Sequence, residues 1–149
     1  MIQRKQSLYL LLSCILLIVT GGAPLFTFDT ASLTTMTGWR FENVANETIT
    51  HPWGVAVFFI LAAILAIVAI FRFKDRKRQL FLVNYQLLVI IVGCVAVVAY
   101  GLAFGNSRAA DMHCEYGLLL PPLAGVFSFL ARRGIQKDEE LVRAADRIR

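Results

Sequence analysis

Four apolar blocks separated by short polar segments dominate the hydrophobic pattern of the chain. They cover about residues 7–26, 53–71, 80–104 and 115–131. An α-helix rises about 1.5 Å per residue, so blocks of about 20 residues match the roughly 30 Å hydrocarbon core of a bilayer. The pattern therefore predicts an all-α membrane protein, a bundle of four transmembrane helices that forms one integral membrane domain over residues 1–149.

The amino-acid composition supports this prediction, because 58% of the 149 residues are hydrophobic. Soluble domains contain roughly 45–50% apolar residues and do not gather them in such long blocks. The first block could be mistaken for a signal peptide, since Gly21–Ala23 resembles a cleavage site. Pro24 would directly follow the cut, which is a poor position for the peptidase, so we expect an uncleaved first helix.

Basic residues predict the orientation of the helices. The loop between the second and third blocks contains five cations, which we expect to contact lipid headgroups and fix the topology: Arg72, Lys74, Arg76, Lys77 and Arg78. With both termini in the cytoplasm, thirteen of the fifteen Lys and Arg residues lie on the cytoplasmic side. Only Arg40 and Arg108 then lie outside. The positive-inside rule thus indicates a multi-pass protein of the bacterial inner membrane.

The outer loop over residues 27–51 is polar and rich in Thr. Phe26–Phe28 and Trp39–Phe41 alternate between apolar and polar side chains, as short strands do, which allows a small β-hairpin in this loop. The second outer loop, over residues 105–114, is shorter.

The cytoplasmic tail over residues 132–149 has a helical pattern of its own. Glu139 precedes Arg143 by four residues, a favourable helix pair. The pattern predicts a short C-terminal amphipathic helix that lies along the headgroups or against a partner; a solvated helix that only anchors the topology is the alternative. As partner-binding residues we expect Leu141, Arg143, Ala145, Arg147 and Ile148.

Two local features could carry chemistry. Asp111–Glu115 gathers acid, imidazole and thiol groups, but the spacing matches no metal or redox site. Cys14, Cys94 and Cys114 show no pairing pattern, and the redox state of Cys114 stays open. No catalytic constellation can be assembled, so we expect no enzyme activity, no cofactor and no metal. The cations flank apolar spans without interleaved aromatic residues, which argues against a nucleic-acid partner.

Polar and helix-breaking residues in the third and fourth blocks suggest packing rather than transport. Pro121 and Pro122 should bend or interrupt the fourth helix, as in many transporters. Transporters also place polar residues at mid-depth, and we find none there, since Asn84 and Gln86 are expected near the cytoplasmic face. A structural kink is the favoured interpretation. Small residues four apart, such as Ala62 and Ala66, allow close helix contact.

The two ends of the chain resemble a known family. Met1–Arg4 leads into Tyr9–Leu12, and the chain closes with Lys137–Arg149. These segments resemble a domain-of-unknown-function family of small four-helix integral membrane proteins, mostly from Bacteroidetes. The resemblance implies an inner-membrane location and supplies no chemistry.

Three functional hypotheses follow from the sequence. The first is a non-catalytic scaffold or accessory subunit of a membrane complex that acts through its basic loop and C-terminal tail. Its partners would be membrane lipids and another membrane protein, or further copies of the chain. The second is a small transporter or permeation helper for a neutral or apolar solute. The third is an envelope sensor that uses the outer loop.

Overall fold

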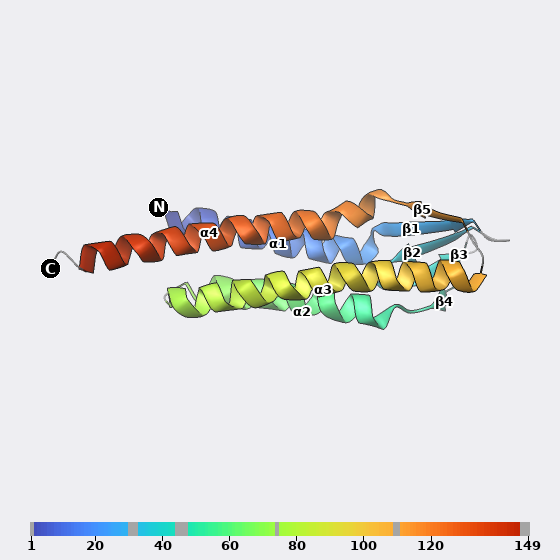
Figure 1. Cartoon of the computed structure of the whole chain (residues 1–149), viewed down its shortest axis with the longest axis horizontal. Coiled ribbons are helices and arrows are strands. Elements are labelled where there is room, and N and C mark those ends of the chain that lie inside the picture. Colours follow the sequence, from blue (N-terminus) through green and yellow to red (C-terminus); the bar gives the residue numbers. More distant parts are fainter. Residues whose placement is uncertain (1, 30–32, 44–47, 74, 109–110, 147–149) are drawn as a thin grey trace.

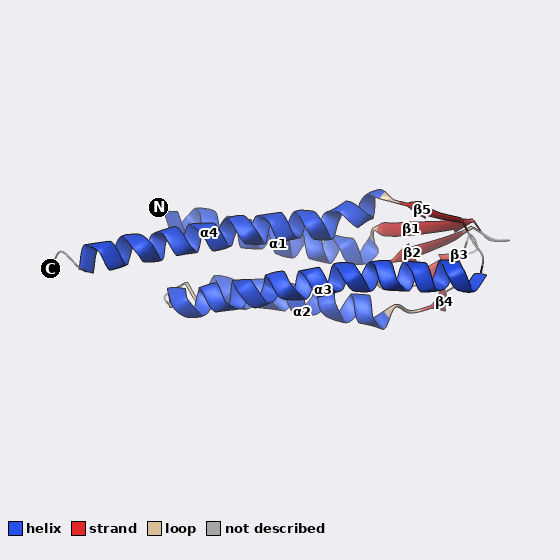
Figure 2. Ribbon diagram, in the orientation of Figure 1, coloured by secondary structure: helices blue, strands red, loops and turns tan. Residues whose placement is uncertain are grey.

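Four long helices run side by side, and a small β-sheet covers one end of the bundle (Figure 1). The computed structural model describes residues 2–29, 33–43, 48–73, 75–108 and 111–146. The helices are α1 (Ile2–Gly22), α2 (Trp53–Phe71), α3 (Arg76–Arg108) and α4 (Leu120–Asp146). We call the end where α1 begins and α4 ends the termini end, and the opposite end the sheet end (Figure 2).

The helices pack through stripes of buried residues that recur in steps of four and three. Each helix contacts two neighbours, so that α1 and α3 each lie between α2 and α4. This spacing keeps one face of a helix toward its neighbours, as in other four-helix bundles. In α1 the stripe is Gln6, Leu10, Ser13, Leu17 and Thr20, and in α4 it is Ala124, Ser128, Ala131, Ile135 and Asp138. In α2 it is Val55, Phe59, Ala62, Ala66 and Ala69, which confirms the expected close contact through Ala62 and Ala66.

The surface of the bundle is apolar. Large side chains such as Ile64, Ile67, Ile91 and Val95 are exposed along its length. Three described helical stretches are long and apolar enough to cross a membrane: Trp53–Phe71, Arg76–Ser107 and Tyr116–Ala144. The apolar part of α1, Gln6–Gly22, is shorter. The molecule therefore has the helices and the surface of a membrane protein.

The sheet has five antiparallel strands in the order β4-β3-β2-β1-β5. Four of them come from the connection between α1 and α2: β1 (Pro24–Asp29), β2 (Thr34–Thr37), β3 (Phe41–Asn43) and β4 (Thr48–Thr50). The fifth, β5 (Asp111–Cys114), comes from the connection between α3 and α4 and pairs with β1. The sheet thus joins the two connections at this end of the bundle.

Aromatic contacts attach the sheet to α3. The Phe104 ring centroid lies 4.3 Å from that of Phe41 and 5.0 Å from that of Phe28. Both strand residues are almost completely buried. Gly101, one turn before Phe104, allows the close approach, because a Cβ there would come within 2.8 Å of the Phe26 ring. The last turns of α3 therefore belong to the core of the sheet end.

The four predicted helices are present, three of them long and apolar enough to cross a membrane, and their ends differ from the prediction. The second span is confirmed at residues 53–71, whereas the first helix ends at Gly22 because Pro24–Asp29 pairs as β1. The third helix is longer than predicted, since its last turns pack on the sheet. The outer loop contains strands, but they form most of a five-stranded sheet instead of a lone hairpin. Phe26–Phe28 lies in β1 as expected, whereas Trp39 and Arg40 form the turn before β3.

Two expectations about the fourth helix were wrong. Pro121 and Pro122 lie in the first turn of α4, directly after a short 3₁₀ turn, η1 (Tyr116–Leu119). First-turn N–H groups have no partner within a helix, so the two prolines do not kink or interrupt the span. The tail also forms no separate helix, because α4 continues unbroken through residues 132–146.

We expect Phe104→Ala to lower the free energy of unfolding by about 3–5 kcal/mol, because it removes a buried ring from the contact between α3 and the sheet. Thermal unfolding in mild detergent measures the effect. The matched control is Leu102→Ala, two residues away on the same helix, where the side chain is 47% exposed. Equal losses in the two variants would contradict the proposed attachment of the sheet.

Candidate functional site

A layer of hydrogen-bonded polar side chains lies at mid-height in the bundle. It joins Ser13 of α1, Gln86 of α3 and Ser128 of α4, and all three side chains are completely buried. The Gln86 Nε2 donates to Ser13 Oγ at 3.1 Å and to Ser128 Oγ at 2.9 Å. The two hydroxyl oxygens are 2.8 Å apart. The neighbouring Cys14 lies against the Ala63 carbonyl, in the middle of α2, which fixes the height of this polar layer.

The protons of the polar layer can be assigned to one pattern. Ser128 donates to the carbonyl of Ala124 at 3.0 Å, so Ser13 must donate to Ser128. Both N–H groups of Gln86 are then used. Its Oε1 atom is buried and accepts no hydrogen bond from the residues that the structure describes. An unpaired buried acceptor costs about 1–3 kcal/mol.

The polar layer contradicts the sequence-based placement of Gln86 near the end of its span. Gln86 lies ten residues into α3, because that helix begins at Arg76. The expectation that no strongly polar residue lies at mid-depth was therefore wrong. A usable signal was present in the spacing: Gln6, Ser13 and Thr20 are seven residues apart, and so are Gln79 and Gln86. All five side chains are buried.

A second polar junction closes the bundle at the termini end. The Gln6 Nε2 donates to the Asp138 carboxylate at 2.6 Å, and both side chains are buried. Arg76 donates to the backbone carbonyl of Asp138 at 3.0 Å. A Cβ at Gly134 would come within 2.9 Å of the Gln6 Cγ, so the glycine lets α1 approach α4. The junction therefore joins α1, α3 and α4.

Beyond Asp138, α4 continues past the turn that joins α2 and α3 (Figure 1). We call residues 139–146 the α4 extension. Leu141 is 55% exposed and Val142 is 45% exposed. Arg143 donates to Glu139 at 2.6 Å, which confirms the predicted helix pair. The extension thus carries exposed apolar side chains on a helix that projects from the bundle.

The other partner-binding residues cannot be placed in the same detail. Ala145 lies in α4, but its side chain lies outside the described part of the chain, as do Arg147 and Ile148 as a whole. The role of the whole set stays a prediction.

The basic loop is built by the short turn between α2 and α3. Arg72 ends α2, where its N–H donates to the carbonyl of Val68. Arg78 pairs with Asp75 at 3.0 Å, and Lys77 is exposed. Lys74 lies outside the described residues. Arg76 also contacts another helix, because its side chain donates a hydrogen bond to the backbone of Asp138 in α4.

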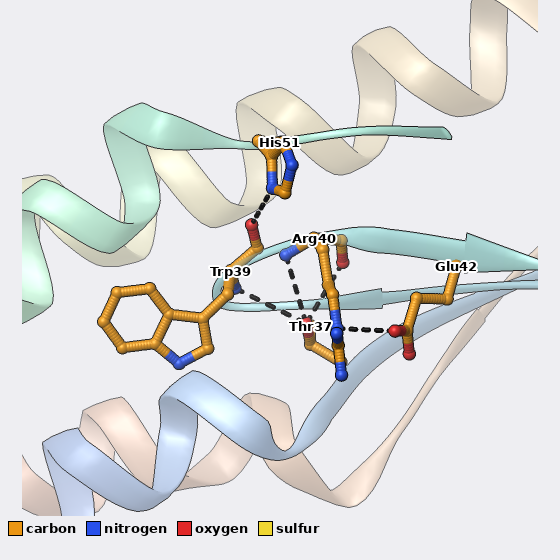
Figure 3. A network of polar contacts seen from close by, with 5 residues as sticks. All are labelled: Thr37, Trp39, Arg40, Glu42 and His51. Atoms are coloured by element: carbon orange, nitrogen blue, oxygen red, sulfur yellow. Dashed lines mark hydrogen bonds and ion pairs between the residues drawn. The ribbon is translucent and has the colours of Figure 1, made fainter. Parts of the chain in front are cut away.

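The turn between β2 and β3 holds a third polar network (Figure 3). The Thr37 hydroxyl accepts from the N–H groups of Trp39 and Arg40 at 3.4 and 3.2 Å. Nδ1 of His51 lies 3.1 Å from the Trp39 carbonyl oxygen, and Arg40 pairs with Glu42. Most of these bonds involve the backbone, so the network shapes a turn and attaches it to the segment before α2.

The residues from Asp111 to Cys114 form an exposed edge strand. His113 Nε2 lies 3.2 Å from the Asp29 carboxylate on β1. Neighbouring side chains of a strand point to opposite faces, so this run does not converge on one point. Among the described residues, no group of three His, Cys, Asp or Glu side chains is arranged to hold a metal ion.

An apolar groove runs between α3 and α4, beside the two prolines. Its main cavity has a volume of about 480 Å³, and its walls include Leu87, Ile91, Val95, Pro122, Val126 and Phe129. A smaller cavity of about 190 Å³ adjoins it at Pro121 and Cys94. Several wall residues belong to the exposed surface of the bundle. This α3–α4 groove therefore opens sideways and does not form a channel along the bundle.

We expect Gln86→Leu to change the free energy of unfolding by no more than about 1 kcal/mol. The variant loses two hydrogen bonds but also removes a buried acceptor without a partner, and the two effects oppose each other. Gln86→Ala should lower the free energy of unfolding by about 2–4 kcal/mol, because removing most of the Gln86 side chain leaves a cavity. Unfolding in detergent measures both. Equal losses for Leu and Ala would mean that the hydrogen bonds, not the volume, stabilise the layer.

No curated protein matches the chain. The domain of unknown function DUF4293 matches residues 2–148, nearly the whole length of the four-helix bundle and its sheet. The chain therefore belongs to the DUF4293 family, as the resemblance of its two ends to a domain-of-unknown-function family predicted.

Proposed function

We propose that this protein is a non-catalytic accessory subunit or scaffold of a membrane complex. It is held in the bacterial inner membrane with both termini in the cytoplasm, and it binds a partner protein through the α4 extension. The observation that carries the proposal is the projection of α4 beyond the rest of the bundle, with Leu141 and Val142 exposed. Apolar side chains on a helix that has left its bundle are stabilised when a partner covers them.

The charge distribution supports the orientation. Lys137 and the basic loop lie toward the termini end, and Arg132 and Arg133 lie on α4 between that end and the polar layer. The sheet end holds acids such as Asp29, Glu42 and Glu115. A membrane protein retains Lys and Arg on the cytoplasmic side, so the termini end is the cytoplasmic one.

A second candidate function is passage of a neutral or apolar solute, and the cavity beside Pro121 favours it. The groove reaches mid-height, where Phe129 follows Ser128 of the polar layer. The bundle centre is filled by buried residues such as Leu17, Phe59 and Ile90. We therefore rank this candidate below the accessory subunit, and flux of a neutral solute into liposomes tests it.

The third hypothesis, an envelope sensor, is supported by a folded outer sheet. The Trp39 indole packs against α1, because a Cβ at Gly21 would overlap its ring. Three cavities lie along α3 and α4, and their walls do not include Trp39. The outer sheet is therefore best explained as a structural cover of the bundle.

We expect a double variant, Leu141→Ser with Val142→Ser, to lose at least about 90% of a stoichiometric partner in affinity purification from mild detergent. Removing two exposed apolar contacts should weaken binding by more than tenfold, since each buried side chain contributes about 1.5–3 kcal/mol. The matched control is Glu140→Ser on the same turn, which should retain the partner. Undiminished association of the double variant, or purification of the full chain alone, would contradict the proposal.

Labelling of Cys114, the free cysteine of β5, tests the proposed orientation of the protein in the membrane. Cys114 is exposed, whereas Cys14 is buried and Cys94 is half-buried. A membrane-impermeant maleimide should label the protein in intact spheroplasts and should not label Cys114→Ser. In the Cys114→Ser background, Lys77→Cys should react only after the cells are lysed. Labelling of Lys77→Cys in intact spheroplasts would reverse the proposed topology.

A further inference from the structure

The α3–α4 groove exists because small residues lie on both of its walls. Gly125 of α4 has no side chain, and a Cβ there would meet only Ile90, at 3.7 Å. Cys94 of α3 is also small, and it lines the main cavity, the cavity at Pro121 and a third one toward Leu102. Larger side chains in these two positions would fill the space. The groove is thus a feature of this pair of helices and not a general roughness of the surface.

The main cavity begins beside the polar layer, at Leu87 and Phe129, and runs toward the sheet end over a length close to half of a bilayer. Its wall on α3 runs from Leu87 to Val95, which corresponds to about 12 Å at the helical rise of about 1.5 Å per residue. Half of the hydrocarbon core measures about 15 Å. The exposed surface of the cavity walls is apolar. A single saturated or unsaturated acyl chain therefore fits the groove in length and in polarity.

Cations lie at one end of the groove. Pro122, Val126, Phe129 and Arg133 follow one another on α4 in steps of four, three and four, so they share one helix face. Phe129 forms the last wall of the cavity, and the Arg133 guanidinium carbon lies 5.6 Å from the centroid of its ring. The groove therefore leads from its apolar walls directly to a positive charge.

The neighbouring Arg132 adds a second donor at this end. Its Nε atom is buried and donates no hydrogen bond to the described residues. Three acids of the termini end have partners elsewhere: Asp138 accepts from Gln6, Glu139 from Arg143, and Asp75 pairs with Arg78. Neither Arg132 nor Arg133 forms an ion pair with the described part of the chain. The Arg133 guanidinium at the groove thus has no acidic partner among the described residues, and the buried Nε of the next residue in sequence, Arg132, has no acceptor among them.

We propose that the α3–α4 groove binds one anionic phospholipid, whose headgroup points toward the termini end. One acyl chain lies along the main cavity, and the phosphate is held by Arg133 and Arg132. Arginine suits this role because its planar group donates two parallel hydrogen bonds to a phosphate. The charge at the groove end selects an anionic lipid over a zwitterionic one. The inference rests on the membrane location in the proposed function, but not on the α4 extension or its partner.

Lipid retention by the purified full chain tests the proposal. The protein in mild detergent is mixed with equal amounts of phosphatidylglycerol and phosphatidylcholine, and native mass spectrometry counts the lipid that remains bound. We expect one phosphatidylglycerol per chain, retained at least about fivefold over phosphatidylcholine. Glycerophosphoglycerol, the same headgroup without acyl chains, should not displace it, because the groove contributes most of the binding.

Two variants separate the headgroup from the acyl chain. Arg133→Gln should lower retention of phosphatidylglycerol about tenfold, as expected for one charge-assisted hydrogen-bonding group of about 1.5 kcal/mol. Gly125→Leu should lower retention of both lipids, because its side chain enters the groove, and Ile90 leaves room for the Cβ. The matched controls are Arg143→Gln on the α4 extension and Val57→Leu on the exposed face of α2. An unchanged elution volume shows that each variant is folded.

Equal retention of the two lipids, or full retention by Gly125→Leu, would overturn the proposal. So would displacement by glycerophosphoglycerol or by inorganic phosphate, which would show a simple anion site. If Gly125→Leu loses a partner protein but retains its lipid, the groove binds a helix of that partner instead of a lipid. The double variant Leu141→Ser with Val142→Ser should retain its lipid, so failure of the accessory role and failure of the lipid site give different results.

Discussion

The hydrogen bonds among Ser13, Gln86 and Ser128 set the register of three helices, and most other contacts depend on that register. A helix surrounded by apolar neighbours can slide along them at low cost, since one apolar contact replaces another. A shift of one turn, about 5.4 Å, would leave three buried polar groups facing hydrocarbon. Buried polar residues serve the same purpose in coiled coils, where they fix alignment at some cost in stability. The Oε1 of Gln86, which accepts no hydrogen bond from the described residues, is such a cost.

From this register the contacts at both ends follow. With Ser13 opposite Ser128, Gln6 arrives beside Asp138, and the missing side chain of Gly134 lets the two helices meet there. At the other end, η1 comes to lie on β1, because the Glu115 N–H donates to Leu25 and Gly117 packs on the Pro24 carbonyl. The sheet then closes over Phe104. Polar bonds thus align the helices, and aromatic and glycine contacts complete each end.

Helix α4 combines three surfaces that have separate roles. Its buried stripe, from Ala124 to Asp138, packs on the bundle. A second face, from Pro122 to Arg133, lines the groove toward α3. Its last two turns leave the bundle and expose Leu141. One unbroken helix carries all three surfaces. A lipid bound in the groove and a protein bound to the α4 extension would therefore contact the same helix. The basic loop between α2 and α3 contacts this helix through Arg76.

Much of the helical architecture could be predicted from the sequence alone. The span over residues 53–71 contains no charge and follows Pro52, so length and composition suffice to define it. The Glu139–Arg143 pair and the strand-like alternation at Phe26–Phe28 depend on neighbours in the chain, and both are present in the structure. Local patterns succeed where the physical cause is itself local, as in helical rise, side-chain alternation and i,i+4 pairing.

Only the tertiary structure decided the features that join distant parts of the chain. The partner of β1 in β5 lies more than 80 residues away, and nothing in either segment specifies the pairing. Gln86 lies eight residues after the basic loop, a position that suits a headgroup contact as well as a buried polar layer. Its hydrogen bonds to Ser13 and Ser128 decide for the buried layer. The two prolines look like a kink until η1 places them in the first turn of α4. In each case the deciding energy comes from a contact across the fold, which hydrophobic periodicity along one segment does not contain.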